Sequence, residues 1–577
     1  MTRYTIKTTL IAAITVLMFS CDDFLEYEPK GALSSENVAA PENIEGLVTA
    51  AYAGIANDDM VGPITSSWIY GSVRSDDAYK AGGGVADVID IHFLEQYNMV
   101  QPQTGDNWMG PRTFENHYKA ISRTNFALRA INATEDFELK AVRTGELRFL
   151  RGHSYFMLKQ LFKYVPYIDE TLSPEEILEV SNREYTNDEL WNKIAEDFQF
   201  AIDNLPETQS EVGRANKYAA MAYLAKVRLY QAYEQDDNHQ VVNINTSRLE
   251  EVVSLTQEVI NSGMYRLQPD FAENFLNGYD NGPESVFAIQ FSIADGTTTG
   301  RVSFVTGLNS PHGAPEYGCC GFHYASQNMV NAFKTDNSGL PMFDTFNESD
   351  MINPQDFLNN GVDPRLDHTV GVPGHPYKYN PNFLYQESWA RDKGVYGFFG
   401  NMKEQQLPDC ECFIKNGPFI GTSKNIDIIR YADVLLMQAE ALIELGRHQE
   451  ALPLINQVRA RAKASTGRLK TADGENPSNY RIEEYVDGGN INWTQENARE
   501  ALRWERRLEF AMESPRFFDL VRWGIAAETL NAYLEEEKTK RDYLSGAHFT
   551  AGRDEYLPIP QREIDFTKNL YVQNPGY

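Results

Sequence analysis

Residues 439–446 read Ala-Glu-Ala-Leu-Ile-Glu-Leu-Gly. Apolar residues recur here at the spacing of a helix that buries one face. Close approach of two antiparallel helices is favoured by small residues, here Ala441, Gly446 and Ala451. The stretch belongs to a helical block predicted over residues 431–462, and another helix is predicted over residues 495–513.

The first half of the chain carries the same helical periodicity. Thr186-Asn-Asp-Glu189 is a capping box, and Pro206 stops the helix that it begins. Helix pairs joined by short loops resemble tetratricopeptide repeats. We therefore predict a mainly α fold with two tetratricopeptide-like regions, over residues 41–269 and 426–577. The helices expected in the first region cover residues 114–131, 140–163, 186–205, 216–233 and 249–260.

Between the two helical regions, residues 270–425 differ in composition and periodicity. This segment is rich in Gly, Pro, Asn, Phe and Tyr and shows little helical periodicity. Long irregular segments are usually functional or disordered, and the aromatic content argues against disorder. We expect a large loop-rich insertion carried by a helical scaffold, which is where binding residues concentrate.

The N-terminus has the features of a secretion signal. Arg3 and Lys7 precede an apolar run, Leu10 to Phe19, that is too short to span a bilayer. Leu17-Met-Phe-Ser-Cys21 resembles a bacterial lipobox. We predict a signal peptide over residues 1–20, lipidation of Cys21 and a tether over residues 21–40. An ordinary secreted protein, with Cys21 near the cleavage site by chance, is the alternative.

The charge balance narrows the range of partners. The 577-residue chain has 82 acidic and 52 basic residues, a net charge of −30, and 12% aromatic residues with 31 Tyr. This balance argues against nucleic acid and against electrostatic adhesion to anionic lipids. An acidic, tyrosine-rich surface suits neutral ligands.

Four cysteines follow Cys21, as the adjacent pair Cys319-Cys320 and as Cys410-x-Cys412. In an exported protein this even number permits disulfides, within each pair or between the pairs. The spacings lack the usual gap of a zinc site. We predict neither a metal site nor a cofactor.

Motifs along nearly the whole chain resemble the SusD/RagB family of surface glycan-binding lipoproteins. They start with Cys21-Asp-Asp-Phe-Leu25 and end with Gln573-Asn-Pro-Gly-Tyr577. Between these lie Tyr118-x-x-Ile121, Arg123-x-Asn125, Glu146-x-Arg148-Phe-Leu-Arg151, Arg430-Tyr-Ala-Asp433, Asn456-x-Val458-Arg459-x-Arg461, Glu505-Arg-Arg-x-Glu509-Phe510, Arg516-x-x-Asp519, Arg522-Trp-Gly524 and Leu557-Pro-Ile-Pro560. We interpret the charged residues of these motifs as structural ion pairs.

The resemblance implies a non-catalytic protein on the outer membrane that caps a SusC-like TonB-dependent transporter and delivers glycans to it. H-E-x-x-H, G-x-S-x-G and P-loop motifs are absent from the sequence. A glycan-active hydrolase is an alternative, since paired carboxylates leave no short motif. A peptide-binding transporter lid is another, since tetratricopeptide helices dock proteins. The acidic chain favours a neutral polysaccharide or oligosaccharide, for example a fructan.

Loop clusters that combine aromatic and polar residues are the candidate sugar sites, because rings match the C–H face of a sugar and polar groups match its hydroxyls. The first cluster holds Asp76 and Asp77, for which a capped turn before a Gly-rich loop is the alternative. The second holds Trp108, between Gly105 and Gly110.

A third cluster holds Cys319, Cys320 and Tyr324, and a vicinal disulfide there would offer a rigid apolar patch. A fourth, weaker cluster holds Trp389, Arg391 and Tyr396. We expect Asp76, Trp108 and the Cys319-Cys320 turn to converge on one shallow face, because each of these three lies in a Gly-rich, non-periodic segment.

Overall fold

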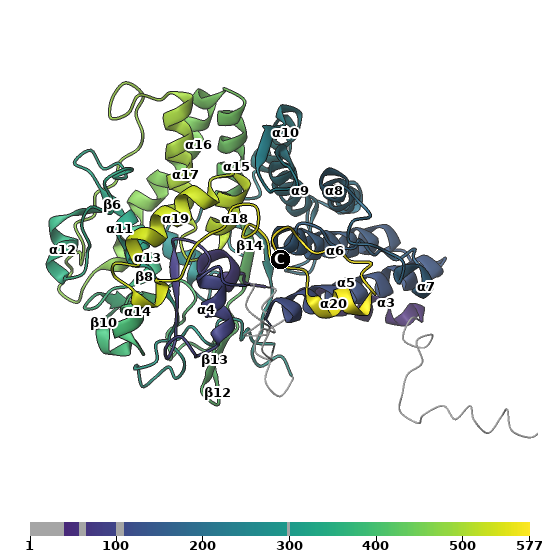
Figure 1. Cartoon of the computed structure of the whole chain (residues 1–577), viewed down its shortest axis with the longest axis horizontal. Coiled ribbons are helices and arrows are strands. Elements are labelled where there is room, and N and C mark those ends of the chain that lie inside the picture. The colour runs from purple at the N-terminus through teal and green to yellow at the C-terminus, as the bar shows by residue number, and fades with distance from the viewer. Residues whose placement is uncertain (1–39, 57–64, 100–108, 297–300) are drawn as a thin grey trace, which may run out of the picture.

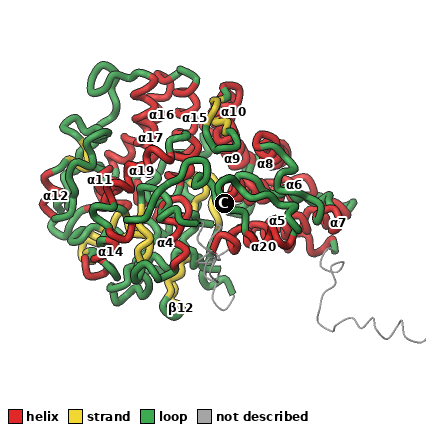
Figure 2. Tube along the Cα trace, in the orientation of Figure 1, coloured by secondary structure: helices red, strands yellow, loops and turns green. Residues whose placement is uncertain are grey.

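The computed structural model describes residues 40–56, 65–99, 109–296 and 301–577. Helices dominate it, as predicted (Figures 1 and 2). The N-terminal helices form one side of the molecule in Figure 1 and pack as successive antiparallel neighbours. They are α3 (Ile44–Ile55), α5 (Met109–Ala133), α6 (Lys140–Phe162), α8 (Asn187–Asn204), α9 (Lys217–Ala232) and α10 (Thr246–Asn261), with the short α7 (Pro174–Ile177). The short α4 (Ile89–Glu95) lies apart from this group, in contact with the strand that begins at Ala78.

The C-terminal helices pack against this group through α15. Lys226 on α9 pairs with Asp433 on α15 at 3.2 Å, and Gln438 on α15 donates a hydrogen bond to Gln257 on α10. One continuous apolar core runs through both groups. The C-terminal helices are α15 (Tyr431–Glu444), α16 (His448–Ala464), α17 (Gln495–Glu509), α18 (Pro515–Arg522), α19 (Ala526–Glu537) and α20 (Gln561–Phe566).

The intervening segment, expected to be rich in loops, also contains short strands and short helices. Its ends are tied together where β14 (Ile426–Arg430) pairs antiparallel with β4 (Ser285–Ile289). It also holds helices α11 (Gln327–Ala332), α12 (Pro354–Asn359), α13 (Arg365–Thr369) and α14 (Lys393–Tyr396). Its other strands are β5 (Phe322–Ala325), β6 (Lys334–Thr335), β7 (Gly361–Val362), β8 (Val370–Gly371), β9 (Pro376–Tyr377), β10 (Asn380–Leu384), β11 (Gly400–Asn401), β12 (Phe413–Asn416) and β13 (Phe419–Thr422).

Three strands belong to the N-terminal half. β1 (Ala78–Ala81) leaves that half to pair with β5 of the insertion, whereas β2 (Tyr233–Gln235) and β3 (Val241–Ile244) pair with each other. Every sheet in the described part of the chain has two strands. The sheets therefore fasten loops to the scaffold and do not form a layer of their own.

Buried ion pairs join α17 and α18 to the rest of the fold, which confirms the structural interpretation of these motifs. Glu505 and Glu509 are fully buried, and both accept hydrogen bonds from Arg365 of α13. Arg506 binds Asp519 at 2.8 Å and Asp433 at 2.8 Å. Such pairs fix how the segments dock, because removing one partner leaves a buried charge without a counter-ion.

The C-terminus is an extended strap interrupted by α20. The backbone N–H of Leu557 donates to the Leu161 carbonyl at 2.7 Å, and Asn574 donates to the Phe162 carbonyl at 2.9 Å. The strap thus returns to the end of α6, as the yellow segment beside α5 and α6 shows (Figure 1). Within the described ranges, no helix is long and apolar enough to cross a bilayer.

Candidate functional site

Strand pairing brings the first and third predicted clusters together. β1 and β5 are antiparallel, with Tyr79 opposite Tyr324 and Ala81 opposite Phe322. The contact continues into the following loop, where the Gly82 N–H donates to the Gly321 carbonyl at 2.8 Å. Segments about 245 residues apart in the sequence therefore form one structure, as the register of the two strands shows.

A buried lysine holds the glycine loop that follows β1. The Lys80 ammonium donates hydrogen bonds to the carbonyls of Ala81, Gly84 and Asp87, at 3.0, 2.9 and 2.6 Å. Burial lowers the pKa of Lys80 to about 8, although Glu95 and Asp87 favour its charged form. The loop is thus organised around a side chain that is inaccessible to a ligand.

Arg391 lies directly over this loop. A Cβ atom at Gly83 would stand 2.7 Å from the Arg391 Cζ, so a side chain at this position would require the guanidinium to shift. The Arg391 guanidinium pairs with Asp87 at 2.7 Å and donates to the Cys320 carbonyl at 3.5 Å. One third of its side chain remains exposed, which leaves N–H groups available to a ligand.

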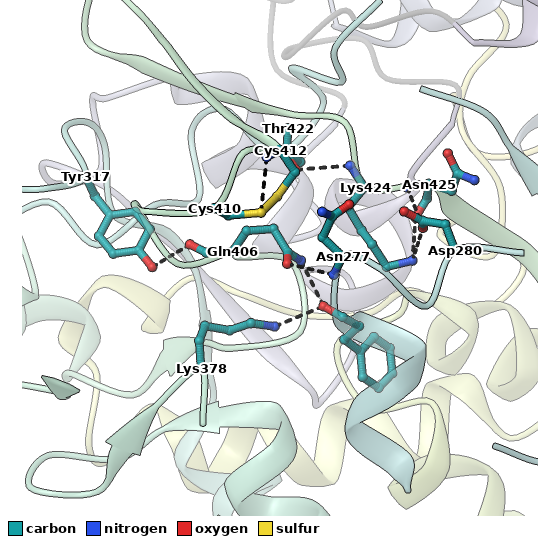
Figure 3. Close-up of a disulfide and its surroundings, with 11 residues drawn as sticks. Asn277, Asp280, Tyr317, Lys378, Gln406, Cys410, Cys412, Thr422, Lys424 and Asn425 are labelled. Carbon is teal, nitrogen blue, oxygen red and sulfur yellow. Dashed lines mark hydrogen bonds and ion pairs between the residues drawn. A yellow bond between two sulfur atoms is a disulfide. The ribbon is translucent and has the colours of Figure 1, made fainter. Parts of the chain in front are cut away.

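Both cysteine pairs are disulfides formed within the pair, Cys319–Cys320 and Cys410–Cys412. They lie at opposite ends of the β12–β13 hairpin. The Cys319 N–H donates to the Pro418 carbonyl at the hairpin tip at 3.0 Å, and Cys412 precedes β12 at its base. Figure 3 shows the Cys410–Cys412 disulfide between Tyr317 on one side and Lys424 and Asn425 on the other.

An aromatic cluster lies around Tyr317, two residues before the Cys319–Cys320 turn. Tyr317 and Trp389 are buried in a cluster with Tyr377 and Tyr385, and half-buried Phe383 and Phe413 pack against its edge. The Tyr317 ring is stacked with Phe383 at an angle of 24° and meets Phe413 edge-on. We call the accessible residues linked by these contacts the disulfide patch: Gly83, Cys319, Phe383, Arg391 and Phe413.

Asp76 and Asp77 lie beneath the surface, so the prediction that they line a shallow face is wrong. Asp76 is 3% exposed and binds the Arg516 guanidinium through both oxygens, at 2.8 and 2.9 Å. Arg507 lies 3.1 Å from Asp76 and 3.5 Å from Asp77. Burial opposes ionisation of Asp76, but Arg507 and Arg516 outweigh it and hold its pKa below the ordinary value.

Three predicted aromatic residues are also inaccessible. Tyr324 and Tyr396 pack in a small core with Tyr79, and Tyr396 lies under the Lys80 ammonium. Trp389 lies 5.1 Å from Phe383 and 5.2 Å from Tyr385, ring centre to ring centre, and is 6% exposed. These three shape the patch from below, contrary to the expectation that they contact sugar directly. Trp108 lies outside the described residues.

Of the nine predicted glycan residues, Cys319 and Arg391 belong to the patch, and Cys320 lies buried beneath it with its carbonyl accepting from Arg391. Phe383 and Phe413 were missed. Both occur in short non-periodic segments beside Pro, Asn or Cys, but neither lies between glycines as Trp108 does. Among the described residues, no cluster of three or more His, Cys, Asp or Glu side chains could hold a metal ion.

Two family models and a full-length relative match this chain. The SusD family model matches residues 283–577, and a model described as "Starch-binding associating with outer membrane" matches residues 23–229. SusD-like protein P2 of Formosa agariphila is 25% identical over 590 aligned positions, covering 99% of each chain.

Solved structures share the fold. A SusD homologue from Bacteroides thetaiotaomicron VPI-5482 superposes with a TM-score of 0.69 at 21% identity, covering 93% of this chain and 97% of the other. Surface glycan-binding protein A from Bacteroides thetaiotaomicron, in complex with laminarihexaose, gives a TM-score of 0.66 at 21% identity and covers 92% and 99% of the two chains. The family model alone spans half of the sequence, and the chain belongs to the SusD family.

Proposed function

We propose that this protein is a lipid-anchored, surface-exposed outer-membrane protein that captures a neutral polysaccharide or oligosaccharide. It delivers the glycan to a partner TonB-dependent transporter and carries out no catalysis itself. Membership of the SusD family supports this proposal, as does the fold shared with a laminarin-binding SusD-like protein and a laminarihexaose complex.

The disulfide patch is the observation that carries glycan capture. Phe383 and Phe413 present half-buried rings, which suit the C–H face of a sugar. Arg391 adds N–H donors for hydroxyl oxygens, and Asp87 fixes its orientation. Strand pairing, Lys80 and the two disulfides hold these groups before any ligand arrives, which reduces the entropic cost of binding.

The charge of the chain favours a neutral glycan. A net charge of −30 repels polyanions such as pectin or heparin, and Asp87 already neutralises Arg391 in the patch. Neutral hydroxyl groups can share the remaining N–H donors of Arg391 without displacing Asp87.

Calorimetric titration with neutral and acidic glycans tests the proposal. We expect Phe383→Ala and Arg391→Ala each to weaken binding of a neutral glycan by roughly 5- to 30-fold, the size of about 1–2 kcal/mol of lost ring or hydrogen-bond contact. Phe566→Ala is the matched control, because that ring is 75% exposed on α20 and outside the patch.

The alternatives give different results in the same titrations. Slow release of shortened products would identify a hydrolase. Binding of peptides without binding of any glycan would identify a peptide-binding lid. Delivery to a transporter requires that the membrane-extracted protein co-purifies with a TonB-dependent partner, and isolation of the protein alone would count against it.

A further inference from the structure

A cavity of about 230 Å³ lies where the N-terminal helices, the insertion and the C-terminal helices meet. Its walls come from α6 and α9, from β13 and β14, and from α15, α17 and α18. No residue of the disulfide patch lines it. Ligand sites often form at junctions between structural units, so the chemistry of these walls matters.

Among the described residues, every lysine and arginine in the cavity walls is paired with a carboxylate. Lys226 and Arg506 share Asp433, at 3.2 and 2.8 Å. Lys403 and Arg430 share Glu513, at 2.6 and 3.0 Å. The fifth cation, Lys424, binds Asp280 at 2.6 Å, a pair visible in Figure 3. An anionic ligand would have to compete with these carboxylates, whereas a neutral ligand would leave the ion pairs intact.

One wall carries a hydroxyl group that the described protein does not satisfy. Ser303 is 1% exposed, and its Oγ has no hydrogen-bond partner. Its backbone is fixed by two hydrogen bonds with Thr422 of β13, at 2.8 and 3.1 Å. A buried hydroxyl without a partner is unfavourable by about 1–3 kcal/mol, and a polar molecule in the cavity would remove that penalty.

Aromatic and amide groups complete the lining. Phe156, Tyr230 and Phe518 contribute rings, and Gln160 and Thr306 contribute polar groups. In this measure of volume one water needs roughly 10–15 Å³, so the cavity is large enough for a sugar ring.

We propose that this cavity is a second saccharide site, which takes a ring of a neutral saccharide chain. The proposal rests on glycan capture as the function, and adds a position that the disulfide patch does not include. The β12–β13 hairpin connects the two places: its tip contacts Cys319, and Thr422 at its base lines the cavity. Figure 3 shows Thr422 and Tyr317 flanking the Cys410–Cys412 disulfide.

Hydrogen–deuterium exchange with hydrolysates of starch, laminarin, inulin and xylan tests the proposal, with trigalacturonic acid as the acidic probe. We expect a neutral saccharide to protect residues 153–160 and 419–430, which border the cavity. Ser303→Ala should weaken this protection about fivefold to tenfold, the size of one net hydrogen bond. Thr306→Trp should fill the cavity and abolish the protection while binding at the patch persists.

Ser154→Ala is the matched control, because this buried hydroxyl donates only to the Leu150 carbonyl within α6. Saccharide binding that Arg391→Ala abolishes, without protection of either segment in the wild type, would refute the cavity site and leave glycan capture standing. Protection by trigalacturonic acid alone would refute the neutral class. Failure of all these saccharides to bind anywhere would refute both proposals.

Discussion

Replacing Asp76 by alanine tests whether the Asp76 carboxylate stabilises the fold or binds sugar. Asp76 follows Ser75 in the turn before β1, and its partner Arg516 lies 440 residues further along the chain on α18. The carboxylate accepts two hydrogen bonds from Arg516 and faces Arg507 at 3.1 Å. All three side chains are buried or nearly so, with exposed side-chain fractions of 4%, 11% and 4%.

The expected loss is large because Asp76→Ala leaves two arginines without their main counter-ion. Breaking a buried ion pair by removing one partner destabilises a protein by about 3–5 kcal/mol. Arg507 retains a hydrogen bond to Asn328 at 2.7 Å, and it lies 3.5 Å from Asp77, so the loss should fall near the lower end of that range. The exposed Asp203→Ala on α8, which removes a bond from Gln199, should change stability by less than about 0.5 kcal/mol.

Urea titrations of wild type, Asp76→Ala and Asp203→Ala measure the difference, and calorimetry at a temperature where all three are folded measures glycan affinity. We expect a much lower unfolding free energy for Asp76→Ala with unchanged affinity. Because the pKa of Asp76 is lowered in the folded state, its contribution is present above its ordinary pKa of about 3.9 and is lost only in stronger acid. A large loss of affinity at unchanged stability would refute the structural role.

Three other variants test separate features. Cys21→Ala should release the protein from membranes into the soluble fraction, as judged by fractionation in high salt, because one lipid cluster is the predicted anchor; continued membrane association would contradict lipidation. Lys378→Met should stabilise the protein by a few kcal/mol below pH 7, because burial lowers the pKa of Lys378 to about 7 and the unfolded chain binds the proton more tightly; this advantage should disappear as the pH rises toward about 10.5, and a pH-independent difference would count against it. Trp108→Ala should weaken glycan binding by about 1–2 kcal/mol with little change in melting temperature, if its ring forms a stacking surface; a large drop in melting temperature at unchanged affinity would identify a core residue.

Helical periodicity predicted the scaffold because each helix carries its own signal. The Thr186–Glu189 capping box forms as expected, with reciprocal hydrogen bonds of 3.3 and 2.9 Å. Predicted helix limits lie within a few residues of α6, α8 and α9. The strands escaped prediction because they have two to five residues, too few for an alternating pattern, and because their partners are distant in sequence.

The site was harder to predict because local composition does not report burial. Asp76 and the glycines after it look like a surface turn, yet α17 and α18 cover the aspartate with two arginines from the far end of the chain. Tyr324 and Trp389 lie in equally irregular segments, yet Trp389 is buried by other insertion residues and Tyr324 packs against Tyr79. Among the predicted residues that the structure describes, only Cys319 and Arg391 combined a recognisable local signal with a position at the surface.

The positions of the two disulfides are explained by the β12–β13 hairpin that they flank. Each closes a very short loop, so each removes little conformational freedom from the unfolded chain and adds little to global stability by that route. Their position is more informative: one meets the tip of the β12–β13 hairpin at Pro418, and the other precedes its base, where Ser423 donates to the Cys412 carbonyl at 2.9 Å. The hairpin is thereby held at both ends, between a surface with accessible rings and a cavity with an unpaired hydroxyl. A loop-built surface that is fixed in this way can present its rings and donors in one arrangement, which is what a weakly interacting ligand such as a neutral sugar requires.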